Sequence, residues 1–256
     1  MSAYQIKAVA DVATIYLYDM IGIAGRDDGK TSAAFAKDVA KLGKVREIKV
    51  RIDSEGGSVF EARRMARTLA EHSAKITVQI DGVCASAATL IACVGSPVTM
   101  AEDGVYMIHE PAMESGGTAE DLRKDMECLE VIRATLVDTY HRKTRKPKAD
   151  ILKWVQAETW MDAKEALSRG FVDQIITPMK MAAKANFTNL PYRHIPARLQ
   201  SAPYTNPSLK KLDANIADME RRLAATKPSA TPLLDSVREQ LRNMERIVND
   251  RQNRRF

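Results

Sequence analysis

Two residues of this chain, Ser86 and His109, are of the types that together carry out nucleophilic catalysis. Ser86 lies in the stretch GVCASAAT at 82–89, and His109 follows in the stretch YMIHEP at 106–111. A serine hydroxyl is a weak nucleophile until a base removes its proton, and histidine titrates near the pH at which most enzymes work. The pair therefore predicts an acyl-transfer site with Ser86 as the nucleophile and His109 as the base.

The sequence around Ser86 predicts a turn between a strand and a helix. A β-prone run at 74–80 leads into this turn, and a run of small residues at 87–94 predicts a helix after it. The first N–H groups of a helix and its positive end favour an oxyanion at such a place. A plainer interpretation stays open, in which Ser86 only caps the helix and His109 is an ordinary histidine at a strand end.

The third residue of such a site is an acid that orients the imidazole and stabilises its charge. We choose Glu158, in QAETWM at 156–161, for this role. Asp162 is the competitor, but its place before the residues AKE makes it the better N-cap of a following helix. Asp173, in a predicted strand after Gly170, is a weaker rival.

Two consecutive glycines, Gly56 and Gly57, are suited to stabilise the charge that develops during acyl transfer. They follow a predicted strand and precede Ser58. Glycine lets the backbone turn sharply and present N–H groups to a developing oxyanion. We expect the N–H groups of Gly57 and Ala87 to be these donors, although a glycine pair is also common in ordinary turns.

Strands and helices alternate along residues 13–177, which predicts an α/β fold with largely parallel strands. Runs of β-branched and aromatic residues predict strands at 13–18, 47–52, 74–80, 97–100, 105–108, 160–161 and 171–176. Apolar residues at helical spacing predict helices at 33–42, 59–72, 87–94, 118–143, 150–157 and 163–168. The alternation ends near residue 177, so we place the first domain at 1–177.

The composition of the 256 residues argues against several classes of protein. No apolar run reaches the length of a membrane span, and the N-terminus lacks the basic start and apolar stretch of a secretory signal. The three cysteines are scattered and form no CxxC pair, which predicts reduced thiols and no metal site. We therefore expect a cytoplasmic protein without membrane contact.

The composition changes after residue 177. Five prolines in 178–208 predict an extended linker, and residues 184–256 hold 14 Lys and Arg against 7 Asp and Glu. Two short apolar repeats within 209–256 predict amphipathic helices of a basic tail, which dock on a partner or pair in an oligomer. Apart from Tyr192 and Tyr204, this region lacks the aromatic residues that accompany basic ones in nucleic-acid sites, so we expect no nucleic-acid partner.

Four motifs, taken in order, resemble the Clp peptidase (ClpP) family over residues 13–177. They are SEGGSV, GVCASAAT, YMIHEP and ETWMDAKEALSRGFVD. Within that family the chain is similar to the head maturation (prohead) proteases of tailed phages, because RIDSEGGSVFEA stands where the housekeeping peptidase has an asparagine–serine–proline–glycine–glycine stretch. The resemblance matches Ser86 to the nucleophile, His109 to the base, and Gly57 and Ala87 to the oxyanion hole. Glu158 falls where the family usually has aspartate.

The resemblance implies a crotonase-like fold of repeated ββα units and a homo-oligomeric ring, with the helix at 118–143 in the contacts between subunits. It also implies that Gly116 and Gly117 form a strand edge on which a substrate peptide lies, and that Gly56 and Ser58 help to bind that peptide. It implies neither a cofactor nor a metal ion. The proline-rich linker and basic tail are absent from the housekeeping peptidase, and in a phage protein they would hold the protease inside the assembling head.

We therefore expect a serine endopeptidase that processes capsid or scaffold proteins during phage head maturation, in the cytoplasm of the bacterial host or inside the prohead. Three alternatives stay open. A housekeeping ClpP-type peptidase would work with an ATP-dependent unfoldase, but SEGGSV and the basic tail count against it. A non-catalytic capsid-assembly scaffold would not need the Ser86/His109 pair. An acyl-CoA hydratase or isomerase of the same fold would not need that pair either.

Overall fold

The computed structural model describes residues 4–22, 31–177, 192 and 194–195. These belong to the first of two compact units, Met1–Tyr204. The expected tail at 209–256 lies outside the described residues, and so does the expected linker at 178–208 apart from three positions. The division into a domain at 1–177, a linker and a tail therefore stays a prediction.

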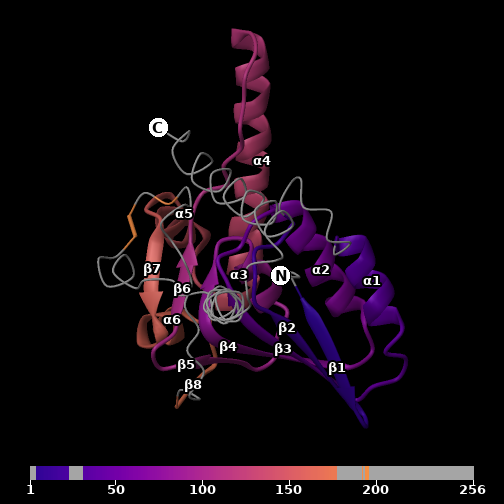
Figure 1. Cartoon of the computed structure of the whole chain (residues 1–256). Coiled ribbons are helices and arrows are strands. Elements are labelled where there is room, and N and C mark those ends of the chain that lie inside the picture. Colours follow the sequence, from indigo (N-terminus) through magenta and orange to yellow (C-terminus); the bar gives the residue numbers. More distant parts are fainter. Residues whose placement is uncertain (1–3, 23–30, 178–191, 193, 196–256) are drawn as a thin grey trace, which may run out of the picture. The chain divides into compact units, whose positions relative to one another are not determined.

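The described residues form one eight-stranded sheet with helices packed around it, as Figure 1 shows. The strands are β1 (Gln5–Val9), β2 (Val12–Leu17), β3 (Glu47–Ser54), β4 (Lys75–Ala85), β5 (Val98–Ala101), β6 (Val105–Ile108), β7 (Thr159–Asp162) and β8 (Gln174–Ile176). The helices are α1 (Ser32–Ala40), α2 (Val59–Glu71), α3 (Ala88–Ala92), α4 (Ala119–Thr144), α5 (Lys148–Gln156) and α6 (Ala163–Arg169). The expected alternating α/β architecture is confirmed.

Most strand pairs are parallel, as the sequence predicts. The main path runs β1-β2-β3-β4-β5-β8, and every pair from β2 to β8 along it is parallel. The antiparallel pairs are β1 with β2 and β6 with β7. The sequence pattern does not predict β1, because this edge strand is mostly exposed and lacks the period-two burial that marks a half-buried strand.

The core forms because alternate residues of the strands and one face of each helix are apolar. In β3 the buried residues Ile48, Val50 and Ile52 follow the period of two. In α2 the buried face of Ala62, Met65, Ala66 and Leu69 follows the spacing of an α-helix. Of the strand expected at 171–176, only Gln174–Ile176 pairs with β5, because Phe171 and Val172 instead bury their side chains in the core.

Two pairings bring the ends of β3, β4 and β6 together. After a shift in register, Ser54 at the end of β3 lies opposite Cys84 in β4. At the end of β4, Ala85 lies opposite Met107 in β6. The carboxyl ends of parallel strands meet at one edge of a sheet, and binding residues gather there. The loops that leave these three strands are therefore neighbours.

The long helix α4 changes its surroundings along its length. Its C-terminal half packs on the body through Leu136, Val137 and Tyr140, which are buried. Its N-terminal half extends beyond the sheet in Figure 1, and Leu122, Met126 and Val131 are exposed there. Across the described stretches of chain, no helix is both long enough and apolar enough to span a membrane.

Candidate active site

Ser86 lies on a tight turn where β4 ends and α3 begins. Its φ of +53° is in the left-handed region, which non-glycine residues seldom adopt outside turns and functional sites. Its backbone N–H donates to the carbonyl of Met107 at 2.9 Å, which ties the turn to β6. The N-cap of α3 is Ala87, and α3 has no side-chain cap. The interpretation of Ser86 as a plain helix cap is therefore wrong.

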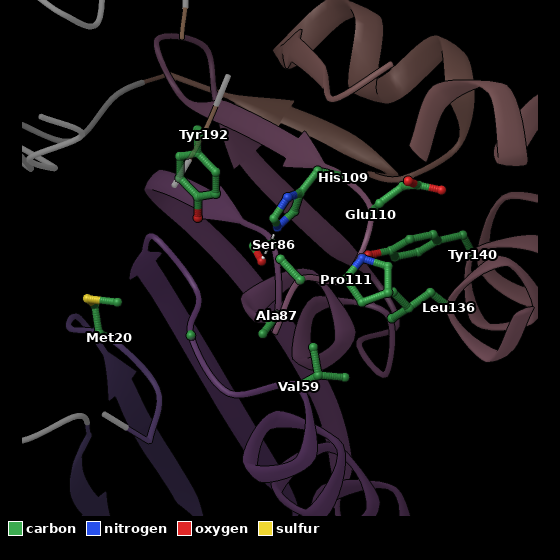
Figure 2. Close-up of a pocket in the computed structure, with 12 residues that line it drawn as sticks. Met20, Val59, Ser86, Ala87, His109, Glu110, Pro111, Leu136, Tyr140 and Tyr192 are labelled. Atoms are coloured by element: carbon green, nitrogen blue, oxygen red, sulfur yellow. Dashed lines mark hydrogen bonds between the residues drawn. The ribbon is translucent and has the colours of Figure 1, made fainter. Parts of the chain in front are cut away.

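The hydroxyl of Ser86 and the ring of His109 are in direct contact. Ser86 Oγ lies 2.7 Å from His109 Nε2, and Figure 2 shows the bond between them. His109 directly follows β6, so the pairing of β6 with β4 is what brings the two residues together. Burial lowers the pKa of His109, while the nearby charges of Glu158 and Glu110 raise it to a smaller extent. The imidazole is thus kept neutral near pH 7, which is the form that accepts a proton.

Glu158 lies close to His109 in the turn between α5 and β7. It is 8 % exposed, and its φ is +48°. Its Oε1 accepts hydrogen bonds from Trp160 Nε1 at 3.2 Å and from the backbone N–H of His194 at 2.7 Å. Its charge favours the protonated form of His109. The carboxylate is therefore placed to stabilise an imidazolium electrostatically.

The two rival carboxylates have structural partners elsewhere. Asp162 is the N-cap of α6, and its Oδ1 accepts from Glu165 N at 2.8 Å, as the sequence predicts. Asp173 accepts from Val98 N at 2.6 Å and pairs with Lys143 at 2.9 Å. Glu110, which sequence reasoning did not single out, also acts on His109 by its charge, but it pairs with Arg133. Of these carboxylates, Glu158 has the placement that suits a third member of the site.

The two glycines after β3 have positive φ values, +99° for Gly56 and +134° for Gly57. A side chain at Gly57 would overlap the carbonyl of Ile21, and one at Gly56 would overlap the Ser86 turn. Within the described part of the chain, the N–H groups of Gly57 and Ala87 donate to no other group. Both residues line the cavity next to Ser86, so the expected oxyanion donors are free to serve that role.

A cavity of about 130 Å³ opens beside Ser86 and His109. Figure 2 shows an apolar wall from Val59, Pro111 and Leu136, with the ring of Tyr140 next to it. The hydroxyl of Tyr140 shares a hydrogen bond of 2.7 Å with Thr89, so it does not add an unpaired polar group to the wall. This cavity suits an uncharged side chain. Its wall could not be predicted from sequence, because its residues come from separate elements with no common motif.

The remaining expected peptide-binding residues lie apart from this cavity. Ser58 caps α2, where its hydroxyl accepts from Glu61 N at 3.4 Å. Gly116 and Gly117 lie in the exposed loop before α4, and no strand is formed there. The φ of +130° at Gly117 lets the chain enter the capping box that Thr118 makes with Asp121. Their role in binding a peptide stays a prediction.

A family model described as Clp protease matches residues 12–179 of this chain. The chain belongs to the Clp protease family. The described sheet and site all lie within the matched range, apart from the residues of β1 and residues 192, 194 and 195. The expected ClpP resemblance is thus confirmed at the level of the family.

Similar proteins include several Clp proteolytic subunits at modest identity. The ATP-dependent Clp protease proteolytic subunit of Streptococcus mutans is 30% identical over 135 residues, which cover 51% of this chain and 69% of the relative. Subunit 2 of Thermobifida fusca is 27% identical over 162 residues, covering 60% and 75%. The subunit of Leuconostoc citreum is 32% identical over 143 residues, covering 52% and 68%. The relation to phage head maturation proteases stays a prediction.

Proposed function

We propose that this member of the Clp protease family is a serine endopeptidase whose catalytic residues are Ser86, His109 and Glu158. The observation that carries the proposal is the 2.7 Å contact between Ser86 Oγ and His109 Nε2. Ser86 has a positive φ and directs its hydroxyl to the half-buried, neutral imidazole of His109. Such a pair is the arrangement by which a serine is activated as a nucleophile.

Each step of peptide hydrolysis has a group available. Ser86 Oγ attacks the peptide carbonyl carbon while its proton passes to His109 Nε2, and the carbonyl oxygen becomes an oxyanion that accepts from Gly57 and Ala87. The imidazolium, stabilised by the charge of Glu158, gives its proton to the leaving amine as the C–N bond breaks. Water then attacks the acyl-serine with His109 again as the base, which releases the acid and restores Ser86.

The substrate is a protein or peptide, and the working form is a homo-oligomeric ring. The exposed side chains of Leu122, Met126 and Val131 support association, because they are 44 %, 62 % and 65 % exposed on one projecting helix. Leu122 and Met126 lie one turn apart on the same face of this helix, which suits helix-to-helix contact between copies of the chain.

The biological setting that we propose is the processing of capsid or scaffold proteins during phage head maturation. SEGGSV after β3 and the basic composition of 184–256 support it. The second candidate is a housekeeping peptidase that works with an ATP-dependent unfoldase. It is favoured by the names of the similar proteins, which are ATP-dependent Clp protease proteolytic subunits.

The catalytic proposal is tested by comparing the wild-type protein with Ser86→Ala and with the control Ser168→Ala, whose exposed serine lies on α6. We expect Ser86→Ala to lose at least about 10³-fold in peptide hydrolysis, because the catalytic residues act as a unit. A fluorophosphonate should label Ser86 in the wild type and in the control. Labelling at another residue would overturn the assignment.

The biological setting is tested by mass spectrometry of the same proteins incubated with the cognate capsid protein. Discrete cleavage of folded capsid or scaffold protein without ATP supports head maturation. Cleavage only when an ATP-driven unfoldase is added supports the housekeeping candidate.

A further inference from the structure

Tyr192, far from the other site residues in sequence, lies directly beside the catalytic pair. Its ring meets the ring of His109 edge-on, with centroids 5.2 Å apart, and the ring of Trp160 edge-on at 5.5 Å. Its hydroxyl donates to the carbonyl of Glu55. Figure 2 shows Tyr192 next to His109, on the side of that ring away from Pro111.

The two described neighbours of Tyr192 also contact the site. The backbone N–H of His194 donates to Glu158 Oε1 at 2.7 Å. Ile195 packs, together with Tyr192 and Trp160, against a buried apolar cluster of Val83, Ala85 and Met107. Tyr192, His194 and Ile195 thus contact, in turn, the ring of His109, the carboxylate of Glu158 and the apolar cluster beneath the site.

The place that Tyr192 fills is built by the folded domain. Its floor comes from the ends of β4 and β6, where Ala85 and Met107 are fully buried. One side is Trp160 of β7, whose indole is oriented by its bond to Glu158. The carbonyl of Glu55 offers an acceptor at the far end. We call this place, formed by Ala85, Met107, Trp160 and the carbonyl of Glu55, the slot. It is flat and apolar, and it offers one acceptor for a hydroxyl, so it matches the shape and polarity of a tyrosine side chain.

We propose that this slot is a subsite for an aromatic side chain of the substrate peptide, with tyrosine preferred, and that Tyr192 is its intramolecular occupant. The proposal rests on the proposed peptidase function and adds a substrate preference to it. In Figure 2 Tyr192 and the wall of Pro111, Leu136 and Tyr140 lie on opposite sides of Ser86 and His109 in the view, and Tyr192 also lines the cavity beside Ser86. A peptide that crosses Ser86 therefore meets the apolar wall of the cavity on one side and the aromatic slot on the other.

The occupied slot has a consequence for reactivity. Substrate must displace Tyr192 before its own aromatic side chain can enter the slot. A site that is open only part of the time reacts more slowly in proportion to the open fraction. We expect the two edge-on ring contacts and the bond to Glu55 to keep the open fraction near one tenth.

The test uses the full-length chain with Tyr192→Ala, Tyr192→Phe and the control Phe60→Ala, an exposed aromatic residue of α2. The measured quantity is the rate at which a fluorophosphonate labels Ser86. We expect Tyr192→Ala to be labelled about tenfold faster than the wild type. Tyr192→Phe should lie between them because it keeps the ring contacts, and the control should match the wild type. Equal rates in the wild type and Tyr192→Ala would overturn the role of Tyr192 as occupant.

A second measurement tests the subsite without using catalysis. N-acetyl-tyrosinamide and N-acetyl-alaninamide are titrated into Tyr192→Ala and the wild type, and binding is followed by ligand-observed NMR. We expect only the tyrosine amide to bind, only to Tyr192→Ala, and to slow its labelling. Binding to neither protein, or equal binding of both amides, would overturn the subsite. Absence of labelling at Ser86 in every protein, with this binding pattern intact, would instead contradict the peptidase function alone.

Discussion

Gly56 lies against the turn that holds Ser86, so closely that a Cβ on Gly56 would be 2.8 Å from the Cβ of Ser86. The same atom would lie 2.6 Å from the carbonyl oxygen of Ala85 and 2.9 Å from the N of Ala87. The register that sets Ser54 opposite Cys84 produces this contact. The glycine turn and the serine turn thus support each other, and neither can shift without the other.

Gly56→Ala should therefore damage both the site and the fold. Two of the three overlaps are with backbone atoms, and the φ of +99° is itself strained for alanine. We expect a loss of about 2 kcal/mol or more in the free energy of unfolding and at least about a tenfold loss in labelling of Ser86. The control is Gly43→Ala, where φ is +61° but no atom lies within 4 Å of the added Cβ. Full labelling of Gly56→Ala would show that the turn tolerates the side chain.

Glu158→Gln should lower turnover and change its pH dependence. Burial already holds the pKa of His109 below its usual range, and the charge of Glu158 opposes that shift. Removing this charge lowers the pKa of His109 further. The acid limb of the rate profile should therefore move to lower pH, while the plateau falls by about 10²-fold or more. Peptide hydrolysis measured across pH checks both effects.

Asp162→Asn is the matched control for Glu158, because asparagine also caps a helix. We expect this variant to keep nearly all of its turnover and the wild-type pH profile, with an unchanged melting temperature. If Asp162→Asn harms turnover more than Glu158→Gln does at equal stability, Asp162 rather than Glu158 is the acid of the site.

Asp53→Asn should stabilise the protein above pH 6. Burial raises the pKa of Asp53 from 3.8 to about 6, while its Oδ1 accepts from Val83 N at 2.9 Å. The folded state therefore holds this proton more tightly than the unfolded state. The resulting stability is fully present below pH 3.8 and is lost as the pH rises through about 6.

The asparagine avoids the buried charge and can keep the bond to Val83. We expect a gain on the order of 2 kcal/mol at about pH 8 that shrinks toward zero near pH 4, measured by urea unfolding. Glu102→Gln, at an exposed carboxylate in the turn after β5, should show no such trend. A gain that does not depend on pH would contradict the ionisation of Asp53 as its cause.

Removing the residues after Ile176 should leave the domain folded. Every strand of the described sheet ends at or before Ile176. The sequence beyond it is predicted to bind a partner protein or other copies of the chain. We expect the truncated protein to melt cooperatively and to label at Ser86, at a rate no lower than the wild type because Tyr192 is gone. It should fail to enter phage heads. A truncated protein that does not fold would place the domain boundary further along the chain.

The sequence by itself determined the chemistry and the order of the elements. Ser86 and His109 are recognisable because a small-residue turn and a strand end are local patterns, and hydrophobic periodicity specifies the strands that precede them. Parallel pairing then predicts that the loops after β3, β4 and β6 share one edge. The glycine pair before Ser58 could be assigned for the same local reason.

Only the tertiary structure decided which side chains surround Ser86 and His109. Met107, Trp160 and Tyr192 come together through strand register and through a segment beyond the last strand, and no local pattern encodes such long-range contacts. Glu158 and Asp162 differ in role because one is buried beside His109 and the other begins a helix, a difference of packing rather than of residue type. The sequence likewise does not show that the N-terminal half of α4 is exposed, because that follows only from how the rest of the domain buries its C-terminal half.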